Sequence, residues 1–160
     1  GPGLDRLLDP RTGWRPVDAA GRRGTDAILL ALSADFAGDR VAVFIGGLGG
    51  MLNAAFEEKI EFYLPDELDP QKIHNSARNL EIAAWKLGNA RDAAGNLLLL
   101  SNEPAQAGQA PNLSFEREFG KMIGNLDLLA ALLADKGHRT IARVAQGVAT
   151  AVFLPVPSLR

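Results

Sequence analysis

The chain has 160 residues, of which 47% are hydrophobic, and this is enough for one compact domain with a buried core but short for two. Its 17 basic and 19 acidic residues leave a formal net charge of -2, so the composition gives no electrostatic reason to expect binding to nucleic acid or to an anionic membrane. There is no cysteine, which excludes disulfides, thiolate metal sites and a cysteine nucleophile and fits a reducing, cytoplasmic location.

The first 23 residues are predicted to be an arginine-rich lead-in to a single globular domain over residues 24–157. The Gly1-Pro2 start is typical of the scar of a cleaved tag, so we expect a fragment of a larger, bacterial-type protein. A solvated arm accounts for the mixed charges of the lead-in, and an anion-binding arm is the alternative.

The first predicted helix covers residues 26–37. Thr25 is placed to cap its first turn, apolar residues recur at helical spacing, and Gly38 is placed to end it. The next segment, residues 40–45, is an apolar run rich in β-branched residues and predicts a strand.

Four glycines follow this strand in the stretch GGLGG. A phosphate-binding turn requires glycines between a strand and a helix, because its backbone must approach the anion closely. No Lys-Ser or Lys-Thr pair follows, and Leu52 stands where a dinucleotide fingerprint needs Gly or Ala. The competing interpretation is a tight turn, or a place where a neighbouring helix comes close. The candidate ligand-binding residues are Gly46, Gly47, Gly49, Gly50 and Met51.

Two further strands are predicted over residues 59–64 and 97–100, and with residues 40–45 they would form a small sheet. Between them, Asp69 and Pro70 indicate the N-cap and first position of a helix that ends at Gly88, with an end at Gly95 as the alternative. One narrow face of this helix is expected to be buried. Its apolar stripe consists of Ile73, Ala77, Leu80, Ala84 and Leu87.

The clearest helix is predicted over residues 114–136, with Ser114 as its N-cap and a broad apolar face. Gly120 and Gly124 lie four residues apart and would let another helix approach, from the same chain or from a second copy. Residues 138–154 fit either a last helix or a β-hairpin that turns at Gln146-Gly147.

His74 lies one residue off the apolar stripe and is expected to be exposed. An exposed histidine on a helix resembles the phosphoacceptor of histidine phosphotransfer helices, although Ser76 and Ala77 stand where those helices have a Lys-Gly pair. An ordinary surface histidine is the alternative. The two histidines of the chain, His74 and His138, lack helical metal-ligand spacing, so no metal site and no cofactor is predicted.

The predicted fold is a helix-rich α+β domain in which two long amphipathic helices pack on a small sheet, with an all-α bundle as the alternative. Every catalytic template fails at a required position, so we expect a non-catalytic protein–protein interaction or assembly module, with a protein partner or self-association. A phosphate- or nucleotide-binding domain that uses residues 46–50, and a phosphorelay through His74, are the functional alternatives. The candidate interface residues are Trp14, Trp85, Gly120 and Gly124.

Overall fold

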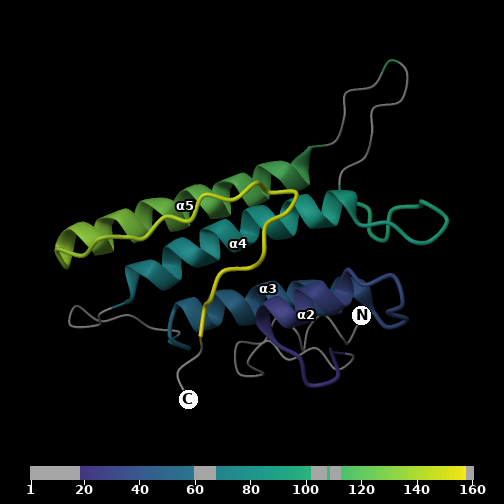
Figure 1. Cartoon of the computed structure of the whole chain (residues 1–160), viewed down its shortest axis with the longest axis horizontal. Helices are drawn as coiled ribbons and strands as arrows, with labels where there is room; N and C mark the ends of the chain where they lie inside the picture. The colour runs from purple at the N-terminus through teal and green to yellow at the C-terminus, as the bar shows by residue number, and fades with distance from the viewer. Residues whose placement is uncertain (1–18, 60–67, 102–107, 109–112, 158–160) are drawn as a thin grey trace.

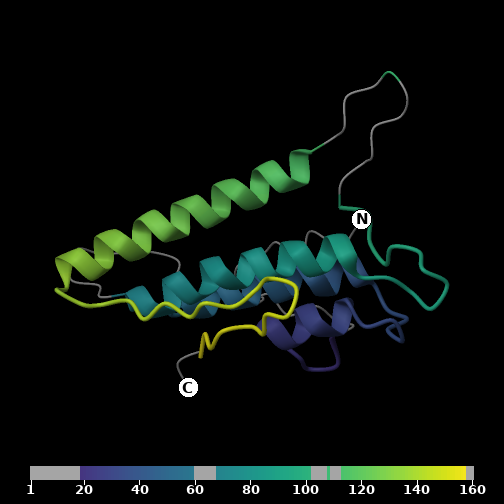
Figure 2. The same cartoon turned by 45° about the horizontal axis from the view of Figure 1, so that its top comes forward.

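Four helices make up the regular structure of the described residues. The computed structural model describes residues 19–59, 68–101, 108 and 113–157, and its helices are α2 (Gly24–Ala31), α3 (Arg40–Ala55), α4 (Pro70–Asn89) and α5 (Ser114–Lys136). α2 packs on α3, α3 on α4 and α4 on α5 (Figures 1 and 2). The β-pairing in these residues is a single isolated antiparallel bridge between Arg91 and Leu97.

The predicted small sheet is therefore wrong for the described part of the chain, and the all-α alternative fits. Residues 40–45 form the start of α3 instead of a strand. Residues 60–64 lie outside the described residues. Residues 97–100 follow a short turn, in which the Asp92 carboxylate accepts backbone hydrogen bonds at 2.8 and 2.9 Å.

Local hydrogen bonds explain why residues 40–45 are helical. Asp39 Oδ1 accepts the Ala42 N–H at 2.9 Å, which caps the start of α3. The Arg40 guanidinium donates to Ala31 O at 2.8 Å and to Ser33 O, so it bonds the start of α3 to the last residue of α2 and to the turn that follows it. These contacts outweigh the modest β preference of valine and isoleucine, and they end α2 well before the predicted boundary.

The predicted helix starts differ in their outcome. The two hydroxyl N-caps are wrong, because Thr25 and Ser114 each lie inside the first turn of their helices. The aspartate N-cap of α4 is confirmed, since Asp69 Oδ1 accepts the Gln71 N–H at 2.9 Å and Pro70 follows at the first helical position.

The hydrophobic core is formed by buried apolar residues from all four helices. The predicted stripe of α4 is buried except for Ala84, which is half-buried and packs against the core. The expected narrow buried face is wrong, because further residues of α4 are also buried, namely Asn75, Ser76, Asn79, Ile82 and Ala83. α5 has the predicted bounds of residues 114–136, and its Phe115 and Phe119 rings stack with centroids 4.5 Å apart. Among the described residues, no helix combines the length and the apolar character needed to cross a membrane.

Residues 139–157, here the C-terminal segment, form neither the predicted helix nor a hydrogen-bonded hairpin. The segment first runs back along α5 and α4, then turns and crosses α4 towards α3 (Figure 1, yellow). The turn is closed by the Thr150 N–H, which donates to Gly147 O at 3.1 Å. The chain thus reverses close to the predicted Gln146-Gly147 turn, but without a backbone ladder between the two arms.

Candidate functional site

The GGLGG stretch lies in the middle of α3 and not in a loop. Interior amides of an α-helix donate to carbonyls four residues earlier, so they are not free to cradle a phosphate. A Cβ atom added to Gly47 would lie 2.8 Å from Ile28 N and 2.9 Å from Gly24 O. Gly47 therefore lets the backbone of α2 touch α3, which is the close helix approach that the sequence left as the alternative.

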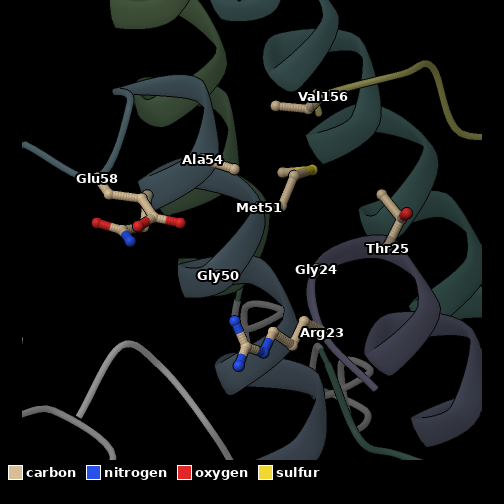
Figure 3. Close-up of a pocket in the computed structure, with 9 residues that line it drawn as sticks. Arg23, Gly24, Thr25, Gly50, Met51, Ala54, Glu58 and Val156 are labelled. Atoms are coloured by element: carbon tan, nitrogen blue, oxygen red, sulfur yellow. The ribbon is translucent and has the colours of Figure 1, made fainter. Parts of the chain in front are cut away.

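A small cavity of about 160 Å³ lies at one edge of this contact, between α3 and the start of α2 (Figure 3). Gly50 and Met51 line it, whereas Gly46, Gly47 and Gly49 do not. Its other lining residues are Arg23, Gly24, Thr25, Asn53, Ala54, Glu58 and Val156. A ligand-binding role for the five predicted residues stays a prediction, and only two of them reach this cavity.

A row of side-chain amides on α4 holds the C-terminal segment. Gln71, Asn75 and Asn79 are spaced four residues apart, which places them on one side of the helix. The fully buried Asn79 donates to Leu154 O at 2.9 Å and accepts the Leu154 N–H at 2.6 Å. Asn75 donates to Pro155 O at 2.9 Å. These two members of the amide row therefore hydrogen-bond to the backbone of the segment.

Gln71 completes this row near the start of α4. Its amide donates to Ala142 O at 3.0 Å and accepts the Ala142 N–H at 2.8 Å. Within the segment, Gln146 bonds to Val152 in the same paired way, at 3.1 and 3.3 Å. A carboxamide carries both a donor and an acceptor. Gln71 and Gln146 therefore each bond to the N–H and the C=O of one residue, as a residue of a neighbouring β-strand would.

A cleft of about 410 Å³ lies between α4, α5 and the C-terminal segment. It is lined by His74, Arg78, Asp127, Ala131, Ile141, Arg143 and Val144. Asp127 accepts a short hydrogen bond from Arg78 and lies 3.9 Å from His74 Nδ1. Arg78 Nη1 is also 2.9 Å from Glu81 Oε1. Among the described residues, no carboxylate forms an ion pair with Arg143.

The His74 side chain is only 13% exposed, in contrast to the predicted surface imidazole. Burial lowers its pKa, and the neighbouring charges of Arg78 and Arg143 lower the pKa further, while Asp127 raises it. The imidazole is therefore uncharged at neutral pH and lies in a net positive field. A phosphorelay through His74 stays a prediction.

The outer face of α5 carries an exposed row made of Gly120, Gly124, Leu128 and Leu132, here the α5 row. Leu128 is 62% exposed and Leu132 is 59% exposed. A Cβ atom added to Gly120 or Gly124 would meet no atom within 4 Å. These two glycines therefore do not serve close packing within the described part of the chain.

The two tryptophans predicted at an interface have different outcomes. Trp85 lies on α4 and is 38% exposed, so part of its ring is available for contact. Trp14 lies outside the described residues. The structure brings neither Trp85 nor the α5 row into the His74 cleft.

Sequence reasoning missed the amide row, although a signal was present. Three carboxamides at a spacing of four residues repeat the helical period as regularly as an apolar stripe does. Their partners lie more than seventy positions further along the chain, and no local pattern identifies those.

The function of this chain must be inferred from its own geometry. Comparisons with protein-family models, with curated proteins and with solved structures gave no match. Within the described residues, no group of three or more histidines and carboxylates is arranged to hold a metal ion. The features that remain as candidates are the α5 row, the amide row and the His74 cleft.

Proposed function

We propose that this domain is a non-catalytic assembly module that self-associates through the outer face of α5. The observation that supports the proposal is the α5 row, in which two largely exposed leucines lie one helical turn apart beside two uncovered glycines. A contiguous exposed apolar patch is more typical of a contact surface than single scattered apolar residues are.

The pattern of the row favours a second copy as the partner. If two α5 helices pack antiparallel with Leu128 facing Leu128, each Gly124 lies opposite Leu132 of the other copy. The glycine then leaves room for the leucine side chain. In the same register Lys121 lies opposite Asp135, so that opposite charges flank the apolar centre on both sides.

The expected association is weak. Burial of a whole leucine side chain contributes about 1.5–3 kcal/mol, and four partly exposed leucines would contribute about 4–8 kcal/mol in a dimer. The loss of translational and rotational freedom on association opposes this with at least about 4 kcal/mol. The most favourable balance of these terms, about 4 kcal/mol, corresponds to a dissociation constant of about 1 mM, so the test needs a high protein concentration.

Sedimentation equilibrium from about 10 µM to 1 mM, a range that extends up to that constant, tests the proposal. The unchanged protein should shift from one chain towards two, and Leu128→Lys should remain a single chain. Leu100→Lys is the matched control, because Leu100 is 75% exposed and lies outside α5. It should associate as the unchanged protein does, and circular dichroism should report the same helix content for all three.

Charge variants test the antiparallel register. Lys121→Asp should weaken association about two- to fivefold, as expected for an exposed ion pair, and the double variant Lys121→Asp/Asp135→Lys should restore it. A protein that remains a single chain at 1 mM, or a dimer that Leu128→Lys leaves intact, would contradict the proposal.

A further inference from the structure

In the cleft between α4, α5 and the C-terminal segment, one of the two arginines, Arg143, has no ion pair with a described carboxylate. Arg78 forms ion pairs with both Asp127 and Glu81. Among the described residues, Asp127 forms an ion pair with no other arginine. Arg143, from the C-terminal segment, lines the same cleft without a carboxylate partner in that part of the chain. One guanidinium is therefore left to face the cleft beside the imidazole of His74.

The remaining walls of the cleft are apolar. Ala131 comes from α5, and Ile141 and Val144 come from the C-terminal segment. The volume of about 410 Å³ is within the range of small-molecule sites and exceeds what a lone inorganic ion requires. Val144 is exposed, so an apolar ligand body would cover it.

We propose that this cleft binds a small organic oxyanion, in which a carboxylate or phosphate group contacts Arg143 and His74 and an apolar body lies against Ile141 and Val144. The guanidinium of Arg143 matches the geometry of either oxyanion and can donate two parallel hydrogen bonds. This site is separate from the α5 row, so it does not depend on self-association.

Binding is coupled to the protonation of His74. The groups that face the imidazole are Arg78 on α4, Asp127 on α5 and Arg143 on the C-terminal segment. The two arginines disfavour the imidazolium and the aspartate favours it. A bound anion adds negative charge beside the ring and raises the pKa of His74, so by linkage the anion binds more tightly as the pH falls towards that pKa.

The experiment is a proton NMR titration of the imidazole resonances, and the chain offers only two histidines to assign. Benzoate and phenyl phosphate are the anionic probes, which separate carboxylate from phosphate preference, and benzyl alcohol is the uncharged control. At least one anion should raise the pKa of His74 with saturation, while the imidazole resonances of His138, which does not line the cleft, should not respond to the anion. Benzyl alcohol should leave the pKa unchanged.

Arg143→Gln supplies two readouts. In the free protein it should raise the pKa of His74, because it removes a neighbouring positive charge. It should also weaken binding of the preferred anion about tenfold, as expected for a lost charge-assisted hydrogen bond. If neither anion moves His74 more than His138, or if Arg143→Gln leaves both the free pKa and the affinity unchanged, the proposed site does not exist.

Discussion

The contact between α2 and α3 and the contact between α4 and the C-terminal segment are built in opposite ways. In the first, Gly47 has no side chain, so the backbone of α3 contacts the backbone of α2, and apolar residues fill the space around this contact. In the second, the buried side chain of Asn79 reaches the backbone of an extended segment and bonds to both the N–H and the C=O of Leu154. One contact depends on the absence of atoms and the other on the presence of particular polar atoms.

This difference predicts how each contact fails. Close packing against backbone cannot relax easily, because main-chain atoms move only with their whole helix. A hydrogen-bonded segment can detach while the helices remain packed, because much of it is exposed and its backbone bonds to side chains of α4 and not to a neighbouring strand. Substitution should therefore unfold the protein in the first region and release the C-terminal segment in the second.

The largest expected effect comes from Gly47→Ala. Its Cβ would lie within 3 Å of main-chain atoms of α2, so α2 must shift, and we expect a loss of about 3 kcal/mol in the free energy of unfolding. Gly120→Ala is the matched control on an open helix surface and should stabilise the protein by about 0.5–1 kcal/mol. Urea unfolding at low micromolar concentration measures both. Equal effects of the two substitutions would contradict the close α2–α3 contact.

Asn79→Ala should have an intermediate effect. It leaves the N–H and C=O groups of Leu154 without their partner, and we expect a loss of about 2 kcal/mol in the free energy of unfolding. Hydrogen exchange should show faster exchange of the Leu154 amide while the amides of α3 keep their protection. Asn89→Ala is the control, because the exposed Asn89 donates only to Trp85 O within its own helix, and it should change little. Unaltered protection of Leu154 in Asn79→Ala would show that the segment is held by other contacts.

The extent of α4 and α5 could be predicted from the sequence because their signals are local. An Asp-Pro start and a long amphipathic pattern identify the two helices without knowledge of any partner. The GGLGG stretch could not be assigned in this way. Glycines signal that the backbone needs space, but whether a ligand or α2 uses that space depends on residues distant in the chain.

The candidate sites follow the same division. Gly120 and Gly124 could be selected from their spacing, whereas their exposure depends on which face of α5 meets α4. His74 could be singled out as a titratable residue near the edge of the apolar stripe. Its burial and its neighbour Arg143 could not be predicted, because the C-terminal segment fits a helix or a hairpin in sequence and forms neither.

The smallest expected effect is the pH dependence of stability. Of the two contacts, only the one between α4 and the C-terminal segment lies beside a histidine with a lowered pKa, namely His74. Burial and two arginines lower the pKa of His74 in the folded protein, so the unfolded chain binds its proton more readily. The contribution of His74 to the free energy of unfolding is complete above its pKa in the unfolded chain, about 6.5. It is lost as the pH falls through the lower pKa of His74 in the folded protein. Urea unfolding between pH 7.5 and pH 5 should therefore show a modest decrease in stability.

His74→Gln should remove this part of the pH dependence, because glutamine does not titrate, while His138→Gln should retain it. The carboxylates whose pKa values are lowered, Asp92 and Glu118, are exposed and titrate below this window, so they contribute little to the difference. If His74→Gln keeps the full decrease, neither burial nor the charges of Arg78 and Arg143 lower the pKa of His74. The stability of the contact between α4 and the C-terminal segment would then be as insensitive to pH as that of the contact between α2 and α3.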